Sequence, residues 1–345
     1  MELPRESKTC NTRIEWVDLS KGIGILFVMY GHCYLEWKYC YWIYSFHMAL
    51  FFFLSGYTFH ADKTNHTLFV IKKIKTILIP YLFFAVTTTV YDKLQAMLHA
   101  KEYSVVDTLL NYILQQRYTL LWFLTCLFIG ELIVYGIYVY MLYSGTKVFI
   151  WLITAVVSFS LFFIYRECVG IDLIWNADLA ILAVSFITLG IAINYINSFE
   201  NISVAKGTTF ISLLVSIISS WLNYNHFEVV DWYSNSFGNP ILFFIAATSG
   251  IVTVISFSLN FSNNSLIRNA LIYLGRNSLV YYGFHRIIID MTFALYNKMG
   301  IEIIKGRLDT VLYAVISVCI SLAVLTPVNI YLTHFWPMLI GKRKH

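Results

Sequence analysis

The stretch RIEWVDLSKGIGILFVMYGH, residues 13–32, is the first place where a polar segment of the chain passes into an apolar one. A cleavable signal peptide carries its apolar region closer to the start of the chain than this sequence does. We therefore expect residues 22–37 to be retained as a first membrane span. The stretch also contains Lys21 and His32, which are unusual in a helix that faces only lipid.

The composition extends this expectation to the whole chain. Of its 345 residues, 59% are hydrophobic, 18% are aromatic and 12% are charged. A soluble protein carries about 25% charged residues. A water-soluble core of this size cannot hide so many apolar side chains, so the lipid bilayer is the expected surrounding. The aromatic content fits side chains placed at membrane interfaces and between helices.

Ten apolar stretches are long enough to enter a hydrocarbon core of about 30 Å, although the first three are short. They are residues 22–37, 45–60, 76–91, 119–140, 148–165, 177–196, 207–223, 240–259, 271–295 and 310–335. The sequence thus predicts an all-α, polytopic membrane protein with about ten transmembrane helices. We expect one domain, residues 1–345, with short cytoplasmic tails at about 1–21 and 337–345.

The distribution of basic residues sets the predicted orientation. Ten spans place both termini on one side, and 15 of the 24 Lys and Arg residues lie on that side, against eight on the other. Arg286 lies within a predicted span. Cytoplasmic segments carry the excess of Lys and Arg, so both termini are expected in the cytoplasm.

Cysteine usage and net charge limit the classes of ligand. The six cysteines are scattered, with no CxxC pair, so the sequence predicts neither a disulfide framework nor a metal site. A net charge of +5 needs no nucleic-acid partner.

The first candidate site residues share one helix face. Lys21 and His32 are eleven residues apart, which is about three helical turns, so both side chains face one way about 16 Å apart along the axis. Nearby glycines, Gly22 among them, allow close approach of another helix or a ligand. A snorkelling lysine and a histidine bonded to a neighbouring helix would explain the same pattern.

Two further groups lie at the next spans. His47 opens the second span in SFHMALFFFLSGYTFH, residues 45–60, as a functional or an interfacial histidine. The basic cluster Lys72, Lys73 and Lys75 is either an orientation signal that binds anionic lipid or a clamp for cofactor phosphates.

The later spans hold polar groups that are costly at bilayer depth unless they have partners. They are Trp122, Glu131, Trp175, Asn176, Asp178, Asn277, Ser278, His285, Arg286 and Asp290. Glu131 or Asp178 would either orient a histidine imidazole or act as a counter-ion in a structural network.

These motifs resemble those of a known family. The stretches at residues 13–32 and 45–60, with LWFLTCLFIGEL (121–132) and YLGRNSLVYYGFH (273–285), are similar to the acyltransferase 3 family of bacterial multi-pass O-acyltransferases. WNADLAILAVSFITLG (175–190) is a weaker fifth match. The chain looks closest to the fucose 4-O-acetylase-like branch.

The resemblance implies a bacterial inner-membrane enzyme that moves an acyl group, usually acetyl, from cytoplasmic acetyl-CoA to a glycan hydroxyl. It implies acetyl-CoA as donor, no metal, a glycan acceptor, and polysaccharide-assembly proteins as further partners. Lys21 stands where many relatives have Arg, and Lys lacks the bidentate fork for phosphate. We also expect no hydrolase-like domain after the last span.

Roles follow from the resemblance and the chemistry together. His32, His47 and Glu131 are the predicted catalytic residues, with His32 as general base. The predicted cofactor-binding residues are Lys21, Lys72, Lys73 and Lys75. The predicted substrate-binding residues are Trp122, Asn176, Asp178, His285 and Arg286. We expect Lys21 and His32 to face one shared tunnel.

Two other functions fit parts of the pattern. A transporter or flippase for a polar or lipid-linked glycan would also need intramembrane His, Asp and Arg, but such folds often carry inverted repeats, and none is visible. A membrane scaffold or receptor gives no reason for the Lys21–His32 spacing.

Overall fold

The computed structural model describes residues 13–61, 65–141, 147–196, 206–261, 265–301, 303 and 307–342. Within these ranges every regular element is a helix, apart from an isolated bridge between Asp231 and Ser236. The all-α prediction is therefore confirmed. The outermost parts of the predicted tails, residues 1–12 and 343–345, lie outside the described residues.

Fourteen α-helices follow one another along the described chain, joined by short 3₁₀ segments and one π segment. They are α1 (Glu15–Gly31), α2 (Tyr41–Tyr44), α3 (His47–Tyr57), α4 (His66–Lys73), α5 (Ile79–Leu98), α6 (Val105–Leu114), α7 (Trp122–Met141), α8 (Lys147–Cys168), α9 (Ala177–Tyr195), α10 (Lys206–His226), α11 (Pro240–Asn260), α12 (Leu266–Arg276), α13 (Ser278–Lys298) and α14 (Leu308–Phe335). The short segments are η1 (Trp37–Tyr39), the π segment η2 (Ile74–Leu78), η3 (Ile174–Asn176) and η4 (Pro337–Ile340).

Five helices are long and apolar enough to cross a membrane: α7, α8, α9 together with η3, α11 and α14. The other predicted spans coincide with helices that are shorter or more polar; α3, for example, has 11 residues. The count of about ten spans and the cytoplasmic position of both termini stay predictions.

The predicted span at residues 271–295 differs from the structure, because it is divided into α12 and α13 at Asn277. The Asn277 side chain donates to the Tyr273 carbonyl at 2.7 Å and accepts from Lys342 Nζ at 2.5 Å. Burial and the nearby charge of Arg13 lower the pKa of Lys342. The sequence carries a signal at this point, since Gly275, Arg276, Asn277 and Ser278 interrupt the apolar run.

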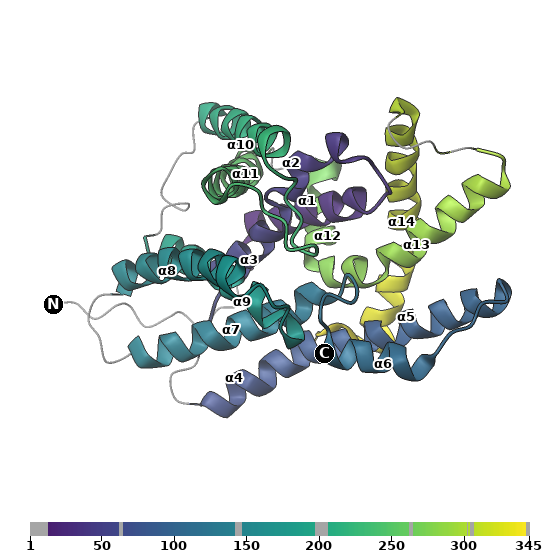
Figure 1. Cartoon of the computed structure of the whole chain (residues 1–345), viewed down its shortest axis with the longest axis horizontal. Coiled ribbons are helices and arrows are strands. Elements are labelled where there is room, and N and C mark those ends of the chain that lie inside the picture. The colour runs from purple at the N-terminus through teal and green to yellow at the C-terminus, as the bar shows by residue number, and fades with distance from the viewer. Residues whose placement is uncertain are drawn as a thin grey trace.

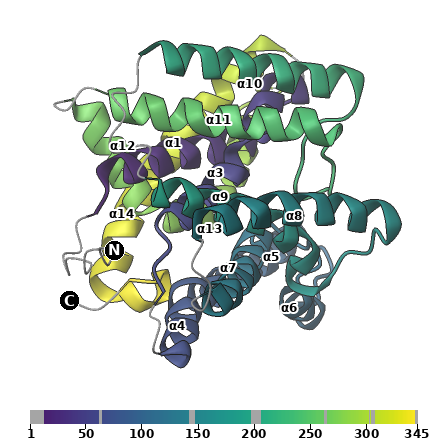
Figure 2. The same ribbon diagram turned by 90° about the vertical axis from the view of Figure 1, so that its left-hand side faces the viewer.

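The helices surround a central pair. Figure 1 shows α1 and α3 in the middle, with α10 and α11 above them, α8 and α9 to one side, and α13 and α14 to the other. Figure 2 shows α10 and α11 running side by side, and α8 running beside α9. Because α1 and α3 lie at the centre, many of their side chains are buried.

Glycines allow the central helices to touch backbone to backbone. A Cβ at Gly22 of α1 would overlap the carbonyl of Leu271 in α12, and one at Gly275 would overlap the carbonyl of Asp18. Of the two alternatives for Gly22, helix packing is therefore the one the structure supports. The α1–α12 contact is also held by an ion pair between Arg276 and Asp18 at 2.9 Å.

Candidate active site

Two cavities lie along α1, one beside its middle and one at its C-terminal end. The Lys21 cavity has a volume of about 300 Å³, and its polar lining includes Lys21, Ser55 and Glu131. The His32 cavity has a volume of about 420 Å³, and its lining includes His32 and His47. Lys21 and His32 thus line different cavities, where the spacing predicted one shared tunnel.

Glu131 is the centre of the polar wall of the Lys21 cavity. It is 3% exposed, accepts from Ser55 Oγ at 2.5 Å, and pairs with Lys73 Nζ at 2.6 Å. Lys21 is half-buried and lines the same cavity. Glu131 therefore joins α3, α4 and α7, and it pairs with a hydroxyl and an ammonium group rather than with a histidine.

The predicted basic cluster is divided between two environments. Lys73 is half-buried and points inward to Glu131, whereas Lys72 and Lys75 are exposed and line neither cavity. The π segment η2 begins directly after Lys73, and its extra residue per turn changes which side chains face inward. Lys72 and Lys75 thus remain on the surface, close in sequence to the inward-pointing Lys73.

The His32 cavity receives residues from the other end of α1. His32 is the C-cap residue of α1, not an internal helix residue, and is half-buried. His47, 4% exposed, opens α3, as the sequence predicts. Arg286 and Trp122 of the predicted substrate-binding set also line this cavity. Residues far apart in the sequence thus meet around His32.

The tautomers of two buried histidines follow from their backbone partners. His47 Nδ1 lies 2.8 Å from the Ile43 carbonyl, and His285 Nδ1 lies 2.8 Å from the Tyr282 carbonyl. Because a carbonyl only accepts, each Nδ1 carries the hydrogen and each Nε2 has a lone pair. Backbone carbonyls therefore perform the orienting task that the sequence assigned to Glu131 or Asp178.

His285 lies behind His32. The two ring centroids are 5.1 Å apart, and His285 is fully buried. Its Nε2 has no hydrogen-bond partner among the described residues. The pair therefore places an unused acceptor beside the predicted general base.

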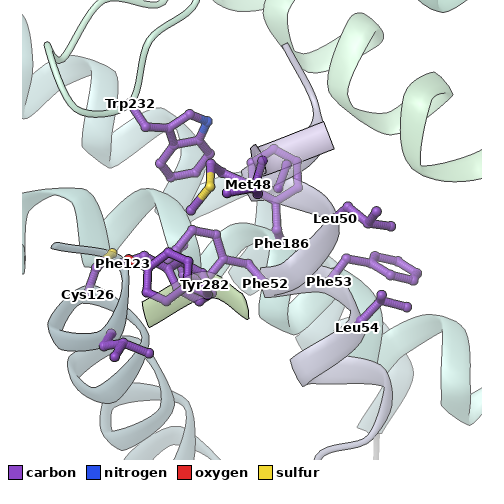
Figure 3. Close-up of a cluster of buried hydrophobic side chains, with 14 of the residues drawn as sticks. Met48, Leu50, Phe52, Phe53, Leu54, Phe123, Cys126, Phe186, Trp232 and Tyr282 are labelled. Carbon is purple, nitrogen blue, oxygen red and sulfur yellow. The ribbon is translucent and has the colours of Figure 1, made fainter. Parts of the chain in front are cut away.

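A partition of apolar side chains divides the two cavities. Met48 lines both, Phe123 and Tyr282 line the Lys21 cavity, and Trp232 lines the His32 cavity. Figure 3 shows Met48 between the indole of Trp232 and the rings of Phe123 and Tyr282. Met is unbranched with three rotatable bonds, so its side chain can repack to open this boundary.

A comparison with known families adds to this geometry. The family model of the acyltransferase domain, acyltransferase 3, matches residues 14–326. The chain belongs to the acyltransferase 3 family. No curated protein and no solved structure matches it. Membership of this family, together with the apolar helices of the chain, indicates a membrane acyltransferase. The fucose 4-O-acetylase-like branch stays a prediction.

Two predicted substrate-binding residues of this acyltransferase 3 protein lie in a structural network instead. Asn176 and Asp178 are buried and line neither cavity. Asp178 and Asp172 both pair with Arg117, whose side chain is 7% exposed. Asn176 accepts from the Arg117 backbone at 3.1 Å and donates to Thr125 at 3.1 Å. This network joins the start of α9 to the segment before α7.

Arg117 is not among the site residues predicted from the sequence. The available signal was that Asp178 needs a basic partner at bilayer depth, and that Arg117 lies on the same predicted side. The predicted site also left out Tyr34 and Asp290, which both line the His32 cavity. The Tyr34 hydroxyl donates a hydrogen bond to Asp290 at 2.5 Å.

We expect Arg117→Met to destabilise the protein by about 3–5 kcal/mol, because it leaves the buried Asp178 without its cation. The measurement is the thermal midpoint of the purified protein in detergent. Arg307→Met is the matched control, since Arg307 pairs with Asp309 at the surface with a side chain 59% exposed, where a pair contributes about 0–1 kcal/mol. Equal midpoints for the two variants would contradict the structural role.

Proposed function

We propose that this acyltransferase is a multi-pass enzyme of the bacterial cell membrane that moves an acetyl group from cytoplasmic acetyl-CoA to a hydroxyl of a cell-surface or exported glycan. One observation carries the proposal. The Lys21 cavity follows α1 from Lys21 to Val28, the His32 cavity lies at the C-terminal end of α1, and the two cavities share Met48. Such an arrangement suits a donor and an acceptor that arrive from opposite sides and react between them.

The Lys21 cavity has the features that a CoA thioester requires. Lys21 offers a cation at the predicted cytoplasmic side of α1, and exposed Lys72 and Lys75 extend the positive surface. Lys73 beside them is paired with Glu131 and would have to exchange this partner for a phosphate. Below the cations the lining becomes apolar at Ile25 and other residues, which suits a pantetheine arm. In this proposal the phosphates stay at the lysines and the acetyl carbonyl reaches Met48.

The His32 cavity would provide the acid–base chemistry. The acceptor hydroxyl oxygen attacks the thioester carbonyl carbon, its proton passes to a ring nitrogen of His32, and the C–S bond breaks. The CoA thiolate then takes that proton, so that His32 returns to its neutral form. His47, with its Nε2 lone pair, would position the acceptor hydroxyl.

Lys21→Gln should weaken acetyl-CoA binding about tenfold or more, because a hydrogen bond to a charged group contributes about 1.5–3 kcal/mol. The dissociation constant is measured by titration calorimetry on protein in nanodiscs. Lys101→Gln is the control, since Lys101 is exposed and lines neither cavity. An unchanged constant for Lys21→Gln would remove this lysine from the donor site.

The direct test of the function is deletion of the gene, followed by NMR of O-acetyl groups on the cell's surface glycans. Loss of a set of O-acetyl signals, restored by the wild-type gene, is expected. Purified protein should then consume acetyl-CoA only when that glycan is supplied. Glycan movement across the membrane without acetyl-CoA consumption would support the transporter alternative instead.

A further inference from the structure

The lining of the His32 cavity indicates what kind of acceptor it takes. The cavity is rich in aromatic side chains. Its charged lining residues are few, so the numbers of carboxylates and cations can be compared directly. This assignment of a ligand rests on the proposed function, which makes the His32 cavity the acceptor side.

Aromatic rings form much of the cavity wall. Trp122 and Trp232 are stacked, with centroids 6.2 Å apart and planes at 18°, and both line the cavity with Tyr233 and Tyr118. The C–H face of a pyranose ring packs well against such rings, because their faces carry the negative part of a quadrupole. The wall therefore suits a sugar ring better than a flexible chain.

Polar atoms in the wall are ready to bind hydroxyl groups. Asp231 and Asp290 both line the cavity, and carboxylates accept hydrogen bonds from hydroxyls. Trp232 is 1% exposed, and its indole N–H has no hydrogen-bond partner among the described residues. An unpaired buried donor is costly, so a ligand oxygen at this nitrogen would remove the cost.

The charge balance of the lining disfavours an anionic ligand. Arg286 lies 3.6 Å from Asp290, so its charge is already matched. Asp231 accepts from Tyr233 N at 3.1 Å and from Ser234 Oγ at 2.5 Å, and it forms no ion pair within the described part of the chain. With the histidines neutral, the lining carries one more carboxylate than cations.

We infer that the sugar unit bound beside His32 is an uncharged pyranose rather than a uronic acid or a phosphorylated sugar. The aromatic wall that includes Tyr118 and Tyr233 packs against its C–H face. The carboxylates of Asp231 and Asp290 accept from its hydroxyls, and the surplus charge of Asp231 repels a carboxylate at the sugar's C6 position.

The test compares sugars that differ only at C6, where a carboxylate replaces the hydroxymethyl group. Methyl glycosides of glucose, galactose and mannose are titrated against protein in nanodiscs, each beside the methyl glycoside of its uronic acid, and dissociation constants are measured by saturation-transfer NMR. At least one uncharged sugar should bind about tenfold more tightly than its uronate, because like charges at an interface are repulsive. The difference should shrink as salt is raised, through screening.

Asp231→Asn should bring the uronate closer to its uncharged counterpart, because it removes the surplus charge and keeps an acceptor oxygen. Asp107→Asn, at an exposed position of α6 that lines neither cavity, should leave the difference unchanged. The salt series on the wild type answers the question even if Asp231→Asn does not fold.

Tighter binding of a uronate, or no binding of any of the six sugars, would overturn the inference. This experiment contains no acetyl donor, so it measures sugar binding separately from acetyl transfer. If an uncharged sugar binds selectively here, but a separate assay with acetyl-CoA shows no acetyl transfer, the proposed function is rejected and the sugar site is retained.

Discussion

His32→Ala should lower acetyl transfer by about 10³-fold, the largest effect on activity that we expect from a single substitution. A positioned general base contributes about 10²–10⁴-fold. His32 lines the cavity that would hold the acceptor, beside His47, and its ring lies 5.1 Å from that of His285. The measurement is the initial rate of acetyl transfer from radiolabelled acetyl-CoA to the identified glycan by protein in nanodiscs.

Binding of the donor should be almost unaffected by the same change, because His32 and Lys21 line different cavities. His99→Ala is the matched control, since His99 is exposed at the end of α5 and lines neither cavity. Turnover of His32→Ala above one tenth of the wild-type rate would remove His32 from the chemistry. A parallel loss of acetyl-CoA affinity would point to misfolding instead.

Much of the helical content was predictable from local properties of the sequence. Apolar stretches at residues 148–165 and 240–259 coincide within a few residues with α8 and α11, because helix length and hydropathy depend only on neighbours in the sequence. The position of His47 at the start of α3 was predictable for the same reason.

Features that depend on long-range contacts were not predictable. The spacing of Lys21 and His32 places them on one helix, but the partition between their cavities is formed by Met48, Phe123, Tyr282 and other side chains that arrive from α3, α7 and α13. The pairing of Arg117 with Asp178 likewise joins residues 61 positions apart. No local pattern in the sequence specifies either contact.

Backbone contacts between central helices belong to the same class, and they lead to the largest expected effect on folding. Gly190 of α9 lies against α3, where a Cβ would overlap the carbonyl of Phe53 and lie 2.8 Å from the Tyr57 nitrogen. These obstacles are backbone atoms, so no side-chain rotation relieves the overlap and α9 would have to move away from α3. Overpacking costs about 1–3 kcal/mol even when side chains can adjust.

Gly190→Leu should therefore reduce the yield of monodisperse protein in detergent by about tenfold or more, as measured by fluorescence-detected size exclusion. Gly136→Leu is the matched control, because Gly136 is exposed on α7 and a Cβ there would meet no atom within 4 Å. Both variants replace a helical Gly by a better helix former, a gain of about 0.8–1 kcal/mol, so propensity alone predicts that both are stabilised. Only the α3–α9 contact predicts opposite outcomes, and equal yields would show that these helices do not pack as described.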